Sequence, residues 1–137
     1  RSGETDFAVI SPYGVFCLEA KTGAVRVEDG VWYAGPSSSN TVKNPFEQSL
    51  AASDAIYKFL VEGSPIERGV LTGSGVLLPD VILDISSMEV NKELAYDQRD
   101  IKKGLQKYVE RIADYWFKER RNFGEKIRSA FPNITLS

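Results

Sequence analysis

The sequence predicts a mixed α/β domain, and three observations support this fold class. Four short segments rich in β-branched and aromatic residues come first, separated by turn-forming residues. A segment with a strong helix-start signal follows, and the chain ends in a long amphipathic segment after another strand-like region. Strands followed by helix, strand and helix are typical of a domain in which helices pack on a sheet. We interpret residues 1–137 as one such domain and, because the chain begins without methionine, as a fragment of a longer protein.

The first four strand-like segments pair into two predicted hairpins, residues 5–10 with 15–21 and residues 24–28 with 31–34. The first turn is Ser11-Pro12-Tyr13-Gly14, and the second is Asp29-Gly30, the strongest two-residue turn signal in the chain. Both faces of the first hairpin are largely apolar, which is typical of strands covered on both sides. Residues 35–43, which include a proline and three serines, are predicted to form a loop.

A helix is predicted from Asn44 to Val61. Asn44 is a favoured capping residue, Pro45 suits the first helical position, and Glu47 completes a capping box. One stripe of this helix is expected to face the sheet, and it consists of Gln48, Ala52, Ala55 and Phe59.

Two further strand-like segments, residues 70–72 and 76–78, are interrupted by Gly73-Ser74-Gly75. No Gly-Lys-Ser/Thr follows these glycines, so we interpret them as a bulge or tight turn and not as a phosphate-binding loop. Residues 79–96 give no clear signal. A second helix is predicted over about residues 97–117, with basic residues continuing to about 128. Its expected apolar face consists of Ile101, Leu105, Tyr108, Ile112 and Tyr115.

Composition excludes several kinds of chemistry. The chain has no histidine, so Ser-His-Asp and Cys-His catalysis and zinc sites that use imidazole are ruled out. Its one cysteine, Cys17, excludes an internal disulfide and makes the cytoplasm the expected location. No apolar run approaches the ~20 residues of a membrane helix. Any metal ion would therefore be held by oxygen atoms, which favours Mg²⁺ or Mn²⁺.

Three charged residues on the first hairpin form a candidate metal site. With a four-residue loop, Asp6 lies directly across from Glu19, and alternation places Lys21 on the same face. A register slip of one residue would move one carboxylate off that face. Two carboxylates at this spacing repel each other by up to ~1 kcal/mol, and a divalent cation between them would turn the repulsion into ligation. The alternative is a salt-bridge network between Lys21 and the two carboxylates.

The last part of the chain is basic. Residues 101–137 contain nine Lys and Arg against four Asp and Glu, a balance of +5. Lys103, Lys107 and Arg111 recur at four-residue spacing, and Lys118, Arg120 and Arg121 follow with Lys126 and Arg128. Trp116, Phe117 and Phe123 are interleaved with them, which suits phosphate contacts with base stacking. The alternative is an ordinary solvated helix end.

The residues Thr5-Asp6-Phe7-Ala8-Val9-Ile10-Ser11-Pro12-Tyr13-Gly14-Val15-Phe16-Cys17-Leu18-Glu19-Ala20-Lys21 resemble the signature of the nuclease-related domain, or NERD, family. Gly23-Ala24-Val25, Gly30-Val31-Trp32 and Asn44-Pro45-Phe46-Glu47-Gln48 follow in the same order as in that family. The resemblance covers about residues 3–61 and is only general beyond Val70.

The resemblance implies a PD-(D/E)xK nuclease, with a restriction-endonuclease-like core of mixed sheet flanked by helices. It implies Asp6 and Glu19 as ligands of Mg²⁺ or Mn²⁺ together with the Ala20 carbonyl, Lys21 as the catalytic lysine, and Gln48 as an assisting helix residue. Domains of this family occur fused to helicases, so DNA (or RNA) and a fused or associated helicase are the expected partners. The alternative is an inactive nucleic-acid-binding or protein-docking module of the same fold.

One departure from that pattern concerns the start of the fold. The superfamily usually has a helix before the first strand, and this chain lacks it. We therefore expect a truncated domain, or a homo-oligomer in which a second copy covers the face that this helix would cover.

Overall fold

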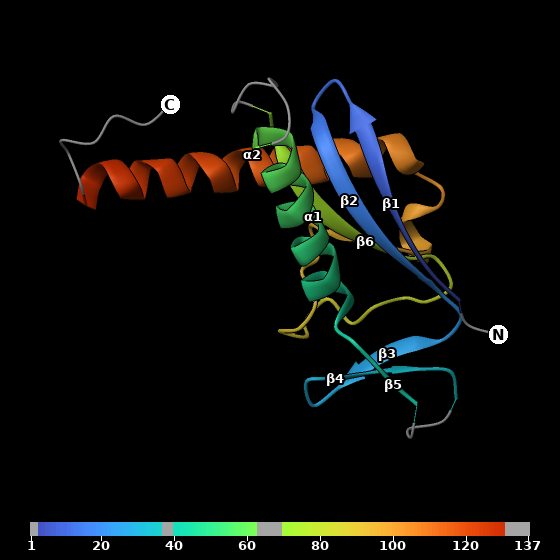
Figure 1. Cartoon of the computed structure of the whole chain (residues 1–137). Coiled ribbons are helices and arrows are strands. Elements are labelled where there is room, and N and C mark those ends of the chain that lie inside the picture. The colour runs from blue at the N-terminus through green and yellow to red at the C-terminus, as the bar shows by residue number, and fades with distance from the viewer. Residues whose placement is uncertain (1–2, 37–39, 63–69, 131–137) are drawn as a thin grey trace.

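A four-stranded mixed sheet with one helix on each face forms the centre of the structure, and a three-stranded sheet lies below it (Figure 1). The computed structural model describes residues 3–36, 40–62 and 70–130. The elements are β1 (Gly3–Ser11), β2 (Gly14–Thr22), β3 (Val25–Glu28), β4 (Val31–Ala34), β5 (Thr41–Val42), α1 (Pro45–Glu62), β6 (Thr72–Leu78), β7 (Ala95–Asp97), a 3₁₀ turn (Gln98–Asp100) and α2 (Leu105–Ala130). This is the predicted mixed α/β architecture, and it is consistent with a restriction-endonuclease-like fold. No helix within the described ranges is long and apolar enough to cross a membrane.

The first hairpin has the predicted register. Ile10 pairs with Val15 and Asp6 pairs with Glu19 across antiparallel β1 and β2. In the strand order β1-β2-β6-β7, β2 is a central strand and pairs in parallel with β6. The expectation that both strands are covered on both sides is right for β2 and wrong for β1, which lies at the edge. Phe7 and Ile10 of β1 are accordingly 39% and 84% exposed.

The second hairpin also forms as predicted, with Glu28 pairing with Val31. The loop prediction for residues 35–43 is wrong at its end, because β5 pairs with β4 and extends the small sheet to three strands. Trp32 of β4 is buried and packs against Phe46 at the start of α1, with 5.9 Å between the ring centroids. This contact ties the small sheet to the helix that covers β2 and β6.

Helix α1 begins where the sequence predicts. The Asn44 side-chain oxygen accepts hydrogen bonds from the backbone amides of Phe46 (2.9 Å) and Glu47 (3.4 Å), as a helix cap does. The predicted packing stripe is right in its first half, where Gln48 and Ala52 are half-buried, and wrong in its second half, because Ala55 is exposed and Phe59 is 71% exposed. The buried side of the helix is made of smaller residues and lies one position further along. It contains Ser49 and Ser53, with Ala52 and Ile56 half-buried.

The glycines after residue 72 lie inside one continuous strand, β6, so the predicted bulge or turn is wrong. They are required because α2 crosses the sheet very closely at this point. A Cβ atom on Gly73 would overlap the indole of Trp116. A Cβ atom on Gly75 would overlap the hydroxyl of Tyr108 and come within 2.9 Å of Leu18 Cδ2.

Gly75→Ala is therefore expected to destabilise the protein by about 3 kcal/mol, the upper part of the range for overpacking a core. Urea unfolding measures the effect. Tyr108→Phe removes the overlapping hydroxyl, so the double variant should lose less stability than the two single variants together. Strict additivity would contradict the close approach of α2 to β6 at Gly75.

The second helix starts later than predicted. Asp97 and Asp100 do form a capping box, but it caps the N-terminus of the short 3₁₀ turn and not that of α2. Gly104, with φ of 87°, separates this turn from α2. The helix itself runs from Leu105 to Ala130. Ile101 and Leu105 are consequently about half exposed. The face that packs on the sheet consists of Tyr108, Val109, Ile112, Ala113 and Trp116.

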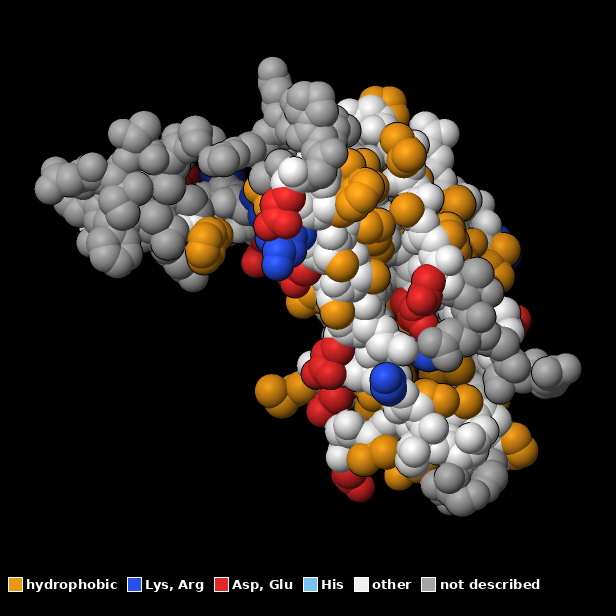
Figure 2. Space-filling model, in the orientation of Figure 1, with side chains coloured by type: hydrophobic (Ala, Val, Ile, Leu, Met, Phe, Trp, Pro, Cys, Tyr) orange, Lys and Arg blue, Asp and Glu red, His pale blue; other side chains and the backbone are white. Residues whose placement is uncertain are grey.

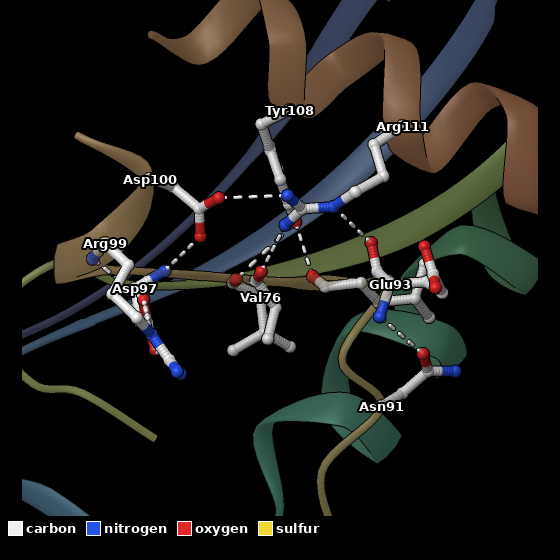
Figure 3. A network of polar contacts seen from close by, with 10 residues as sticks. Val76, Asn91, Glu93, Asp97, Arg99, Asp100, Tyr108 and Arg111 are labelled. Carbon is white, nitrogen blue, oxygen red and sulfur yellow. Dashed lines mark hydrogen bonds and ion pairs between the residues drawn. The ribbon is translucent and has the colours of Figure 1, made fainter. Parts of the chain in front are cut away.

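A polar network fastens the start of α2 to β6 and β7 (Figure 3). The Tyr108 hydroxyl donates to the Leu94 carbonyl at 2.6 Å and lies 3.5 Å from the Val76 carbonyl of β6. Arg111 donates to Asp100 at 2.9 Å, to the Glu93 carbonyl at 3.1 Å and to the Ala95 carbonyl of β7 at 2.5 Å. Burial acts to raise the pKa of the Asp97 carboxyl. Hydrogen bonds from the Arg99 side chain and from the amides of Leu83 and Arg99 outweigh it, and the pKa lies below its usual value. The network thus fixes β6, the parallel neighbour of the strand that carries Glu19.

Candidate functional site

The hairpin and α1 bring the predicted acidic residues to one hollow. Asp6 on β1 and Glu19 on β2 are register partners, so their Cβ atoms are about 5 Å apart. Both residues line a cavity of about 180 Å³ together with Cys17 of β2 and with Ser49 and Ala52 of α1. The candidate site therefore lies between the sheet and α1, on the face opposite α2 (Figure 1).

The two carboxylates differ in their surroundings. Asp6 is exposed, whereas the Glu19 side chain is only 3% exposed. Lys21, two residues further along β2, is equally buried, and its Nζ lies 3.5 Å from Glu19 Oε1. This oxygen accepts no hydrogen bond from the part of the chain that the structure describes. A buried carboxylate oxygen with only a longer ion pair retains capacity for a ligand.

The pKa of the Cys17 thiol depends on the charge of Asp6. Burial raises the pKa of Cys17, and the negative charge of Asp6 raises it further. Both side chains belong to the same face of the hairpin and line the same cavity. Cys17 is therefore a neutral thiol near pH 7, which makes it a poor nucleophile at this site.

Asp6→Asn is expected to lower the pKa of Cys17, because it removes one of the two effects that raise it. The pH dependence of alkylation by iodoacetamide measures this pKa, and its midpoint should move to lower pH. Glu28→Gln, which alters an exposed acid on β3, should leave the midpoint unchanged. An unchanged midpoint in Asp6→Asn would place the Asp6 carboxylate away from the cavity.

The donor atoms suit a hard divalent cation. The cavity offers the carboxylates of Asp6 and Glu19, and the buried Glu19 oxygen accepts no hydrogen bond from the described residues. No group of three acidic, cysteine or histidine residues that could enclose a metal occurs among the described residues. Mg²⁺ commonly takes only one or two carboxylates and completes its octahedron with waters and substrate phosphates. The residues present therefore fit Mg²⁺ or Mn²⁺ held partly by substrate.

Gln48 lies in the first turn of α1 and is half-buried. The α1 residues that line the cavity are Ser49, Ala52 and Ile56. Ser49, which no sequence pattern singled out, is 2% exposed, and its hydroxyl donates to the Phe46 carbonyl at 3.1 Å. The spacing of small residues from Pro45 through Ser49 to Ser53 was the signal that could have identified this side of the helix.

The predicted basic surface is not one surface. Lys103 precedes α2 and is exposed, Lys107 lies near Glu110, and Lys118 pairs with Asp114 at 2.9 Å. Arg111 was expected at a nucleic-acid surface, but its guanidinium contacts Asp100 and the Glu93 carbonyl and anchors α2 to the sheet.

The aromatic and basic residues further along α2 also divide into two groups. Trp116 is 8% exposed and donates its indole N–H to the Ser74 carbonyl, so it belongs to the core and cannot stack on bases. Phe117, Arg120, Arg121 and Phe123 remain at the surface. The side chains of Lys126 and Arg128 lie outside the described residues.

Comparison with known proteins identifies the family. The model of the nuclease-related domain family matches residues 1–77, which is more than half of the chain and includes Asp6, Glu19, Lys21 and Gln48. No curated protein and no solved structure gave a match. The family match and the hairpin that pairs Asp6 with Glu19 agree with the resemblance in the sequence, and the chain belongs to the nuclease-related domain family.

Proposed function

We propose that this chain is a Mg²⁺- or Mn²⁺-dependent nuclease domain that hydrolyses phosphodiester bonds of DNA. The observation that supports it most is the pairing of Asp6 with Glu19 at one cavity, where a buried Glu19 oxygen accepts no hydrogen bond from the described residues. Membership of a nuclease-related family favours the same chemistry. A fused or associated helicase would deliver the DNA to such a domain.

In this proposal Asp6, Glu19 and the Ala20 carbonyl hold the ion. When bound, the ion would polarise a phosphoryl oxygen and lower the pKa of a coordinated water. Lys21 holds the Glu19 carboxylate through the ion pair at 3.5 Å and supplies a positive charge next to the site. Gln48, at the start of α1, would orient water or a phosphate oxygen near the carboxylates.

The test is incubation of the protein with supercoiled, linear and single-stranded DNA in Mg²⁺, in Mn²⁺ and in EDTA. The proposal predicts cleavage that requires the metal and is lost in both Asp6→Asn and Glu19→Gln. Cleavage that persists in both variants would come from another source and would contradict the assignment of the site.

A second candidate function is a catalytically inactive docking or nucleic-acid-binding module. The observation that favours it is the buried Lys21–Glu19 pair, which provides a partner for the carboxylate without any metal. This candidate predicts DNA or protein binding without cleavage, and binding that is unchanged by Asp6→Asn. Binding and cleavage measured on the same variants distinguish the two.

A further inference from the structure

A groove of about 580 Å³ lies at the other end of the sheet from the small sheet, between the C-terminal half of α1 and the middle of α2. Its volume is within the ~300–1,000 Å³ range of ligand-binding pockets. In Figure 1 this is the region where α2 emerges from behind the sheet and passes the end of α1. The aromatic and basic residues that line this groove are Tyr57, Phe117, Arg120, Arg121 and Phe123.

Three aromatic rings on the two walls of the groove are open to solvent. Tyr57 of α1 is 39% exposed, and Phe117 and Phe123 of α2 are 57% and 64% exposed. All three rings keep a substantial exposed surface although the hydrophobic core lies next to them. Figure 2 shows charged side chains of both signs at the surface where α2 passes the end of α1, with hydrophobic side chains on either side of them. Flat aromatic faces in an open groove suit a ligand that is itself flat.

Two arginines add positive charge to the same groove. Arg120 donates to the Thr72 carbonyl at 3.2 Å, and its guanidinium lies 5.1 Å from the centre of the Trp116 ring. These contacts fix its position at the wall of the groove while it remains exposed. Arg121 is also exposed and lines the groove, opposed by a single acid, Asp54. The two arginines outweigh Asp54, so these three side chains together carry a net positive charge.

We propose that this groove binds unpaired nucleotides of single-stranded DNA, with bases against the aromatic rings and phosphates near Arg120 and Arg121. The choice of ligand rests on the proposed nuclease function. Aromatic faces with arginines recur in sequence-tolerant single-strand binding, because every base has a face that can stack. Duplex DNA offers no free base faces, so these rings would gain little from it.

The groove is at a suitable distance from the candidate metal centre. Thr72, at the groove, precedes Val76 by four residues on β6, which is about 13 Å along a strand. Val76 is the register partner of Glu19 on β2. This separation corresponds to about four nucleotides at the 3.4 Å rise of a DNA strand. A single strand that leaves the groove is therefore long enough to reach Asp6 and Glu19 within a few nucleotides.

Fluorescence anisotropy with a labelled 12-mer of deoxythymidine, in EDTA, tests the proposal without cleavage. We expect the parent protein to bind this strand more tightly than a 12-base-pair duplex. Phe117→Ala should weaken binding between about 5-fold and about 150-fold, the range for loss of one stacked base. Arg121→Ala should reduce the salt dependence of binding by about 0.7 in log–log slope. Asp54→Asn should bind more tightly than the parent.

Matched controls lie outside the groove. Leu105→Ala removes an exposed apolar group, Lys92→Ala removes an exposed basic group, and both variants should bind like the parent. All substituted residues are exposed, and melting temperatures confirm that each variant is folded. Absence of binding, tighter binding of the duplex, or full affinity in Phe117→Ala would overturn the proposal.

Cleavage assays on the same variants separate this inference from the proposed function. Phe117-dependent binding without metal-dependent cleavage by the parent would support the groove and refute the nuclease. Cleavage that requires Glu19, together with single-strand binding that is indifferent to Phe117, would support the nuclease and refute the groove.

Discussion

Glu19→Gln is expected to lower metal-dependent DNA cleavage by about 10³-fold or more. Glutamine has the shape of glutamate but lacks the charge that holds a divalent cation. The ion contributes several kcal/mol to a phosphoryl-transfer transition state, and ~4 kcal/mol corresponds to about 10³ in rate. Asp6 alone leaves too few protein oxygens to retain the ion, because the described residues supply no third carboxylate to the site.

Single-turnover cleavage of a labelled DNA fragment in Mg²⁺ measures this loss. Glu28→Gln is the matched control, since Glu28 is a partly exposed acid on β3 outside the cavity. The control should cleave like the parent. Full activity in Glu19→Gln would show that the cavity between β1, β2 and α1 is not where DNA is cleaved.

Lys21→Met is expected to lower the free energy of unfolding by about 3–5 kcal/mol in EDTA. Methionine fills most of the space, but Glu19 is then left as a buried carboxylate without its ion pair at 3.5 Å. Removal of one partner from a buried pair typically has a cost of this size, since the remaining charge stays out of water. Mg²⁺ should restore part of the lost stability, because the ion binds the folded state and neutralises Glu19.

Urea unfolding with and without Mg²⁺ measures both effects. Glu19→Gln/Lys21→Met is the informative companion, because it removes the charge that Lys21→Met leaves behind. The double variant should be more stable than Lys21→Met in EDTA and indifferent to Mg²⁺. If Lys21→Met were as stable as the parent, the ion pair with Lys21 would not be what stabilises the buried Glu19 carboxylate in the folded protein.

The geometry of Asp6 and Glu19 was predictable because it follows from local rules. A four-residue turn sets the register of a hairpin, and the strand period of two then places Lys21. The start of α1 was equally predictable, because Asn44 caps its own helix. Both features depend only on residues close together in sequence.

Several errors concern contacts between distant segments. The apolar spacing in α1 favoured Phe59 as a packing residue, but the close approach of α1 to β2 and β6 selects Ser49 and Ser53 instead. In the sequence Gly73 and Gly75 resemble turn glycines. In the structure they are glycines because Trp116 and Tyr108 leave no room for a Cβ atom at either position. A single sequence contains no record of such approaches.

The position of β1 was missed for a related reason. Its apolar residues suggested a strand covered on both sides, yet the sheet order places it at the edge with Ile10 84% exposed. The basic residues of the C-terminal segment also have different roles in the fold, since Arg111 anchors α2 to the core and Arg121 lines the groove. The charge pattern of a sequence does not show which basic side chains form contacts inside the fold and which remain at the surface.

Binding of Mn²⁺, followed by electron paramagnetic resonance of the free ion, tests the two-carboxylate centre most directly, because it needs neither DNA nor turnover. We predict one Mn²⁺ site in the parent protein, weakened at least about 10-fold in both Asp6→Asn and Glu19→Gln and unchanged in Glu28→Gln. Mg²⁺ should compete for the same site. Mn²⁺ affinity that is the same in the parent and in both site variants would contradict a metal centre at Asp6 and Glu19.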